Sequence, residues 1–314
     1  MKNPLVSVII PNYCHAKYLD QRIKSVLNQT YTNFEVIILD DCSPDGGESK
    51  AVIEKYRNDK HILHIEYNEH NSGSTFKQWY KGFCLARGEL IWIAESDDYC
   101  ESILLEMCVD KFQLYPDLAM VHTTSIMVKE DGIAMSLKDT SENIPEGYLK
   151  GEDFIVKYMT TENAIWNASA VVFRKEYALR ANKIYMDYKA AGDHLFWVLL
   201  AEQGGYYHTS IHLSYFRHHA IKVTPGKYKQ GITHIEEFNT IQYILNHFAD
   251  AYDDIQLIYN SYIPQILYYE YDSNEIRRNL KKLWRNANPK AYRHAVARSY
   301  VNRICNCIKR IFNE

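Results

Sequence analysis

Two hydrophobic periods alternate along the first 128 residues of the chain. Short apolar runs, typical of buried strands, are separated by segments in which apolar residues recur at helical spacing. The predicted strands are residues 6–10, 35–39, 62–66, 90–94 and 118–128, and the predicted helices are residues 19–27, 48–57, 75–86 and 101–115. This alternation predicts a doubly wound α/β fold, in which helices flank a mostly parallel sheet.

The second half of the chain is less regular. From Gly231 to the end, Tyr, Leu and Ile recur in successive predicted helices. The elements expected before them are a mobile loop over residues 138–147, a helix over 151–159, a strand over 169–173, a helix after Asp193 and one or two strands over 206–217. We therefore expect residues 1–225 to form the domain that holds the sheet, and residues 226–314 to form a C-terminal helical extension.

Charge and composition exclude several classes of protein. The 314 residues include 36 Lys or Arg and 39 Asp or Glu, and the net charge of −3 predicts no general attraction to nucleic acid. Seven cysteines, without the spacing of a metal site or a disulfide framework, indicate a reducing cytosol. We find no signal-peptide pattern and no apolar run near the roughly 20 residues that span a bilayer. We expect a cytoplasmic protein, either soluble or peripheral to a membrane.

Polar residues follow four of the predicted strands. In a parallel sheet the carboxyl ends of the strands meet at one edge, where ligands bind. The residues at these ends are Pro11-Asn12-Tyr13, Asp40-Asp41, Asn68 to Asn71 and Glu95-Ser96-Asp97-Asp98. Because no glycine-rich phosphate loop follows the first strand, a phosphorylated ligand would need a divalent cation to bridge it to these carboxylates. The sequence therefore predicts Mg²⁺ or Mn²⁺ in an acidic crevice.

Several segments carry a resemblance to a known family. They are residues 6–13, 25–31, 36–43, 86–89 and 95–98, in this order and spacing. Through them the chain resembles the family 2 inverting glycosyltransferases of the GT-A fold, a Rossmann-like fold, over about residues 4–225. The resemblance implies a nucleoside-diphosphate sugar donor, usually a UDP-sugar, and a divalent cation. It also implies inversion at the anomeric carbon, with an acceptor hydroxyl on a bacterial cell-surface polysaccharide or a lipid-linked glycan.

The resemblance assigns donor binding to five residues, which are Pro11, Tyr13, Asp41, Asp97 and Arg217. Tyr13 would stack on the base, Pro11 would shape the turn before it, and Asp41 would accept a hydrogen bond from the uracil ring. Asp97 would contact the ribose or the metal, and the guanidinium of Arg217 suits a diphosphate. Ordinary packing for Tyr13 and turn capping for Asp41 stay open as alternatives.

The resemblance also assigns the cation, the base and the acceptor. Asp98 is the favoured metal ligand, and His219 would reach phosphate or metal; an Asx-turn and a solvated or core histidine are the alternatives. Asp193 matches the catalytic base, although an aspartate before an apolar helix is also a preferred N-cap. Trp166 lies where relatives bind the acceptor, and a packed core tryptophan is the alternative.

Residues 275–314 reverse the charge balance, with eleven Lys or Arg and two acidic residues. Apolar residues form one helical stripe among these cations, at Val296, Tyr300, Ile304, Ile308 and Ile311. Such a stripe is typical of a helix that lies on a membrane, here the inner face, where a lipid-linked acceptor would be. Docking on the catalytic domain or on a second copy fits the pattern equally well, and the oligomeric state stays open.

Two other classes are alternatives to a glycosyltransferase. A sugar-phosphate nucleotidyltransferase shares the architecture, but it is expected to carry a glycine-rich basic loop where this chain has Pro11-Asn12-Tyr13. A non-catalytic binding or assembly module would keep the fold without keeping Asp41, Asp97, Asp98 and Asp193, all of which are present. We therefore predict a metal-dependent inverting glycosyltransferase.

Overall fold

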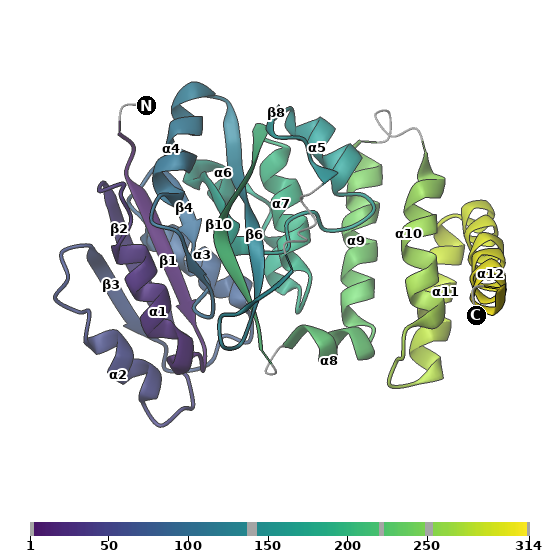
Figure 1. Cartoon of the computed structure of the whole chain (residues 1–314), viewed down its shortest axis with the longest axis horizontal. Helices are drawn as coiled ribbons and strands as arrows, with labels where there is room; N and C mark the ends of the chain where they lie inside the picture. The colour runs from purple at the N-terminus through teal and green to yellow at the C-terminus, as the bar shows by residue number, and fades with distance from the viewer. Residues whose placement is uncertain (1–2, 137–142, 220–222, 249–253, 313–314) are drawn as a thin grey trace.

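A ten-stranded sheet with helices on both faces forms the centre of the molecule (Figure 1). The computed structural model describes residues 3–136, 143–219, 223–248 and 254–312, without the side chains of residues 223–225 and 306–312. The strands are β1 (Val6–Asn12), β2 (Phe34–Asp40), β3 (Ile62–Tyr67), β4 (Leu90–Ile93), β5 (Tyr99–Cys100), β6 (Leu118–Lys129), β7 (Ala134–Ser136), β8 (Gly147–Leu149), β9 (Val171–Arg174) and β10 (Gly205–His218). Every strand predicted from an apolar run is present, and part of the loop predicted over residues 138–147 lies outside the described residues.

The strand order is β3-β2-β1-β4-β9-β6-β10-β5, with β7 beside β6 and β8 beside β10. The pairs among β1 to β4 are parallel, as expected from the alternating pattern. Strand β9 then enters between β4 and β6, antiparallel to both, so β6 is not the next parallel strand after β4. The sheet is therefore parallel in its N-terminal half and mixed in the rest.

Helices cover the two faces of the sheet because side chains along each strand alternate between them. Val8 and Ile10 of β1 belong to the hydrophobic cluster that includes α1, α2 and α4, whereas Ile9 belongs to the cluster on the opposite face, with α3 and α7. The helices before the extension are α1 (Ala16–Leu27), α2 (Glu48–Glu54), α3 (Thr75–Leu85), α4 (Leu104–Leu114), α5 (Gly151–Tyr158), α6 (Lys175–Arg180) and α7 (Gly192–Ala201). Both clusters are fully enclosed, as in a three-layer α/β domain.

The C-terminal part is helical, as predicted, and extends to one side of the sheet (Figure 1). Its helices are α8 (Val223–Lys229), α9 (Ile232–His247), α10 (Ile255–Tyr268), α11 (Asn274–Ala287) and α12 (Pro289–Phe312). One hydrophobic cluster runs from Phe196 of α7 through Ile241 of α9 to Trp284 of α11. The predicted boundary between residues 225 and 226 therefore falls within a continuous core, and it stays a prediction. None of the described helices is both long and apolar enough to cross a bilayer.

Candidate active site at the carboxyl ends of the strands

The polar strand ends gather at one edge of the sheet. Strands β1 and β10 both end at the lower edge of the molecule in Figure 1, next to α8. The turn over residues 95–98 lies between them, because β5 folds back and pairs with Ser214 and Tyr215 of β10. The two residues of β5 are too few to give a sequence pattern, yet they bring Asp97 and Asp98 beside Arg217.

At the end of β2, Asp41 is fixed by protein donors. Its Oδ1 accepts hydrogen bonds from Asn68 Nδ2 at 2.6 Å, Ser72 N at 2.9 Å and Gln78 Nε2 at 2.9 Å. Its Oδ2 accepts one, from Ser72 Oγ at 2.7 Å. A carboxylate oxygen has room for a second donor. The structure thus places Asp41 in a rigid orientation with one oxygen able to accept from a ligand, while its role toward a base stays a prediction.

The neighbouring carboxylate, Asp40, has a structural role. Its Oδ2 accepts from Asn12 Nδ2 and from Ser43 Oγ, both at 2.7 Å, and so ties the end of β1 to the turn after β2. On each side of this tie a cysteine adopts a left-handed backbone, with φ of 59° at both Cys14 and Cys42. Such backbones are uncommon for residues other than glycine and are found at ligand sites. They shape the two turns on which a base would lie.

Pro11 and Tyr13 differ in exposure. Pro11 is buried inside β1, where it pairs with Leu39 of β2. The side chain of Tyr13 is 46% exposed at the end of the strand. An aromatic ring with an exposed face at this position can stack on a nucleobase, so the structure is compatible with the predicted role of Tyr13. Pro11 can act only by shaping the backbone.

Glu95 is held by a hydrogen bond that the sequence does not indicate. Trp79 Nε1 of α3 donates to Glu95 Oε1 at 2.8 Å. Burial, with the charge of Asp97 adding to it, raises the pKa of Glu95 to about 8. A raised pKa favours the protonated form of this carboxyl. Neither Trp79 nor its neighbour Gln78 is among the residues that the sequence assigns to the site.

Three side chains form a cluster that fits a divalent cation. Nitrogen atoms of His15 and His219 and a carboxylate oxygen of Asp97 all lie within 4.8 Å of one another. His219 Nε2 is 2.9 Å from Asp97 Oδ2, and His15 Nδ1 is 2.9 Å from Ser96 Oγ, which leaves Nε2 of His15 for a ligand. Burial lowers the pKa of His15, so the ring is neutral, as a metal ligand must be. His15 has no sequence signal beyond its place after β1.

Asp97 is the ionised member of this cluster. Burial opposes its charge, but the hydrogen bond from His219 and the nearby His15 hold the pKa of Asp97 below its usual value. One carboxylate with two imidazoles suits Mn²⁺ better than Mg²⁺, which prefers oxygen ligands. The donor atoms of these three residues therefore fit a divalent cation, and Asp97 would supply the anionic ligand.

Asp98, the metal ligand favoured by the sequence, lies away from this cluster. Its side chain is 1% exposed, and its Oδ1 accepts from Arg217 N at 2.9 Å. Its Oδ2 lies 3.8 Å from Nη2 of the fully buried Arg22. Burial, together with the charge of Asp97, raises the pKa of Asp98 to about 7. The structure thus gives Asp98 a structural position, and its role toward a metal stays untested.

Removal of Arg22 is expected to destabilise the fold. Because its charge lies beside buried Asp98, Arg22→Met would leave that carboxyl without its counter-ion, at a cost of about 3 kcal/mol in the free energy of unfolding. Urea denaturation measures this cost, with Lys24→Met on the exposed face of α1 as the control. The double variant Arg22→Met, Asp98→Asn should recover part of the loss. An unchanged midpoint for the single variant would show that the pair contributes nothing.

Arg217 is occupied by the protein. Its Nε donates to Asp97 O at 2.8 Å, its Nη1 to Glu130 O at 2.7 Å and its Nη2 to Gln21 Oε1 at 2.7 Å. The side chain is 3% exposed. Arg217 therefore fixes the turn that carries Asp97, and its predicted contact with a diphosphate would require these bonds to rearrange.

Asp193 lies in the first turn of α7, away from the N-cap position, which is Ala191. Its Oδ1 accepts from His194 N at 2.9 Å and its Oδ2 from Asn163 Nδ2 at 3.2 Å. Burial raises the pKa of Asp193 to about 6. A carboxylate with this pKa, held by a single side-chain donor, can accept a proton near neutral pH.

Glu236 of α9 fixes the segment just before α7. It accepts hydrogen bonds from the backbone N–H groups of Lys189, Ala190 and Ala191, at 2.6, 2.9 and 2.8 Å. Of these donors, only that of Ala191, the N-cap residue, is among the first N–H groups of the helix, and Asp193 itself accepts from His194 N in the first turn. A contact between segments so far apart in the sequence has no local signal.

Trp166 lies on the loop between Asn163, which donates a hydrogen bond to Asp193, and Asn167. Its side chain is 46% exposed, which rules out the packed core alternative. Asn167 anchors the loop, since its Nδ2 donates to Ser125 Oγ at 3.2 Å and to Ser214 Oγ at 3.1 Å. An open indole face on a fixed loop can pack on the C–H surface of a sugar, and its contact with an acceptor stays a prediction.

Comparisons with known proteins find curated relatives that match part of the chain. Among curated relatives, the chain is 29% identical over 197 residues to the poly(ribitol-phosphate) beta-N-acetylglucosaminyltransferase TarS of Staphylococcus aureus, which covers 60% of this chain and 31% of that protein. It is 33% identical over 129 residues to the putative teichuronic acid biosynthesis glycosyltransferase TuaG of Bacillus subtilis, covering 41% and 50% of the two chains. The chain thus spans half or less of the length of these relatives.

Solved structures match over nearly the whole chain. The crystal structure of S. aureus TarS 1–349 in complex with UDP-GlcNAc has a TM-score of 0.60 at 18% identity, and the match covers 95% of this chain and 91% of that one. This likeness confirms the predicted GT-A fold. The family model "Glycosyl transferase family 2" matches residues 7–172, from β1 to β9. The chain therefore belongs to glycosyl transferase family 2.

Proposed function

We propose that this protein transfers a sugar from a UDP-sugar to a hydroxyl of a cell-surface glycan or its lipid-linked precursor. The observation that carries the proposal is the cluster of His15, Asp97 and His219, which come from three separate segments and meet beside the end of β1. A cluster of this composition suits a cation bound to a diphosphate. The likeness to structures of TarS with UDP and UDP-GlcNAc supports the same donor class.

In the proposed donor complex, Tyr13 packs on the base and Asp41 accepts a hydrogen bond from it through Oδ2. Asp97, with His15 and His219, would hold Mn²⁺ or Mg²⁺, which supplies charge stabilisation for the departing diphosphate. Arg217 keeps the turn over residues 95–98 in position through its three side-chain contacts.

In the proposed transfer step, Asp193 accepts the proton of the acceptor hydroxyl as its oxygen bonds to the anomeric carbon. The bond from that carbon to the diphosphate oxygen breaks on the opposite side, so the configuration inverts. Asn163 keeps the Asp193 carboxylate oriented, and the open face of Trp166 supports the acceptor sugar. We place the reaction in the cytoplasm, in line with the reducing compartment that the cysteine usage indicates.

Membership of the family argues against the alternatives of a nucleotidyltransferase and a non-catalytic module. The names of three relatives, which refer to poly(ribitol-phosphate), teichuronic acid and chondroitin, favour an anionic surface polymer as the acceptor class. The observation on this chain that fits such an acceptor is the exposed Trp166 on its anchored loop.

Calorimetric titration of UDP in the presence of Mn²⁺ tests the donor site. Binding to the unmodified protein is expected, with GDP weaker than UDP. Tyr13→Ala should weaken the binding of UDP at least about tenfold, because stacking on one base is worth about 1–3 kcal/mol. Tyr13→Phe keeps the ring and is the matched control. Full affinity in Tyr13→Ala would place the base elsewhere, and no binding of either nucleotide would overturn the proposed function.

A further inference from the structure

We propose that the outer surfaces of α11 and α12 form a docking site for a bilayer rich in anionic phospholipid. We call this surface the extension face. It consists of Arg278, Lys281, Lys282, Arg285, Tyr292, Tyr300, Val301 and Ile304. The inference concerns where the protein binds, and it is independent of the donor site.

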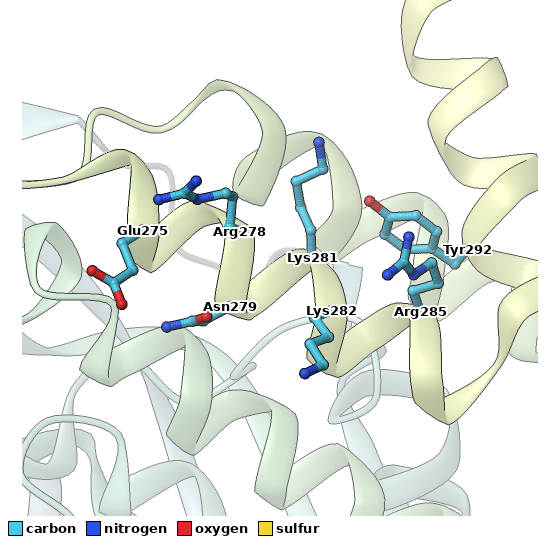
Figure 2. Close-up of a pocket in the computed structure, with 7 residues that line it drawn as sticks. All are labelled: Glu275, Arg278, Asn279, Lys281, Lys282, Arg285 and Tyr292. Atoms are coloured by element: carbon cyan, nitrogen blue, oxygen red, sulfur yellow. The ribbon is translucent and has the colours of Figure 1, made fainter.

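The first part of the extension face is a basic pocket on α11. The pocket has a volume of about 460 Å³ and is lined by four cations, with Glu275 as the one acidic residue (Figure 2). Arg278, Lys281 and Arg285 project to one side of the helix together with Tyr292 of α12 (Figure 2). Leu280 and Trp284 anchor the opposite side of α11 in the core. A phosphate group of a lipid would find several donors here at once.

These four cations have no acidic partner among the side chains that the structure describes. Elsewhere, Lys24 pairs with Asp20, Arg57 with Glu54 and Arg180 with Glu176. Over the described side chains, no ion pair involves Arg278, Lys281, Lys282 or Arg285. The sequence explains this, because residues 276–313 contain eleven Lys or Arg and no Asp or Glu. The extension face is therefore positive in a chain whose net charge is −3.

The second part is apolar and lies on α12. The predicted stripe divides in the structure, because Val296, its first residue, is half-buried against the core, whereas Tyr300 and Ile304 are exposed. Four other residues in the first half of α12, Ala291, Tyr292, Ala295 and Ser299, are buried against the protein. Beyond them, Tyr300 is 52% exposed, Val301 57% and Ile304 59%. The first half of α12 thus docks on its own domain, and the exposed residues continue outward. Ile308 and Ile311 of the stripe lie outside the described side chains.

Tyr292 joins the basic and apolar parts. Tyr292 lines the pocket together with Arg285, and it lies on α12, the helix that also carries Tyr300, Val301 and Ile304. Cations beside exposed aliphatic and aromatic side chains are typical of helices that lie in the membrane interface. Each Lys or Arg near an anionic surface contributes about a fivefold gain in affinity.

The charge distribution favours a bilayer over the other two occupants. A second copy of this chain would bring an equally positive surface, with no carboxylate among residues 276–313 to pair with these cations. A soluble polyanion would pair with the cations but would gain nothing from Val301 and Ile304. An anionic bilayer satisfies both parts, since its headgroups meet the pocket and its acyl boundary meets the apolar residues.

Flotation of the full chain with lipid vesicles tests this proposal. Binding is expected to vesicles of phosphatidylglycerol with phosphatidylcholine, and not to phosphatidylcholine alone. Lys281→Glu, Arg285→Glu should reduce binding at least about tenfold, and Val301→Asp, Ile304→Asp should reduce it similarly. The matched control is Lys55→Glu, Lys60→Glu, which makes the same charge change on exposed residues near α2. Thermal unfolding confirms that every variant is folded.

Each of the following results would overturn the proposal. The first is that the unmodified protein does not float with anionic vesicles. The second is that Lys55→Glu, Lys60→Glu loses as much binding as Lys281→Glu, Arg285→Glu. The third is that Val301→Asp, Ile304→Asp binds vesicles normally while Lys281→Glu, Arg285→Glu no longer binds heparin, which would indicate a soluble polyanion. Sedimentation velocity decides the remaining case, since a dimer that Val301→Asp, Ile304→Asp dissociates would assign the extension face to a second copy. None of these readouts depends on sugar transfer.

Discussion

Asp193→Asn should lower the rate of sugar transfer by at least about 10²-fold while UDP binding remains unchanged. The amide keeps the hydrogen-bonding shape at the start of α7, but it does not accept the proton of the attacking hydroxyl. Hydrolysis of the UDP-sugar donor, in which water takes the place of the acceptor, measures the loss without a known acceptor. Asp187→Asn, an exposed aspartate six residues earlier, is the control.

The pH dependence follows from the pKa of Asp193, which burial raises to about 6. A base works only when it is deprotonated, so the rate is expected to fall as the pH decreases through about 6 and to be level above it. The residual rate of Asp193→Asn should not show this decrease at low pH. If Asp193→Asn has a normal rate, or if its rate still falls below about pH 6, another group accepts the proton.

Asp97→Ala is expected to abolish the part of UDP affinity that depends on Mn²⁺, a loss of at least about 10²-fold. The reason is that Asp97 is the one carboxylate of a cluster whose other members, His15 and His219, offer ring nitrogens. Titrations of UDP with and without Mn²⁺ measure the effect. Asp110→Ala, which removes an exposed carboxylate from α4, should change neither titration.

Asp98→Asn distinguishes the metal ligand that the structure favours, Asp97, from the one that the sequence favours, Asp98. Because Asp98 is buried against Arg22 and Arg217 N, its amide variant is expected to keep the dependence on Mn²⁺ and to lose stability instead. If Asp98→Asn loses the metal effect while Asp97→Ala keeps it, Asp98 is the ligand and the cluster with His15 and His219 is not the metal site.

The sheet was predictable because its strands are buried on both faces and so form continuous apolar runs, as in residues 6–10 and 35–39. The exceptions have physical reasons. Strand β5 contains two residues, which cannot show a period. Strand β9 has the same apolar run as a parallel strand, and only its antiparallel pairing with β4 and β6 distinguishes it.

The site was predictable to the level of segments and less so to the level of single side chains. Adjacent carboxylates in a turn point in different directions, and the sequence does not show which of them is buried. In this structure the side chain of Asp98 is buried, and that of Asp97 lies beside His15 and His219. Arg217 has the donors for a diphosphate, but backbone carbonyls claim them. Both outcomes depend on contacts between segments about 120 residues apart.

The hydrogen bonds from residues 189–191 to Glu236 limit how the C-terminal helices can change in evolution. Asp193 lies in a helix whose preceding segment is held by a carboxylate outside the residues matched by the family model. The C-terminal helices are therefore not a unit that relatives can exchange freely. A recombined protein would have to inherit a carboxylate at the position of Glu236 together with the new helices, or evolve local acceptors for the N–H groups of residues 189–191. Acceptor preference and the choice of C-terminal helices are thus expected to be inherited together.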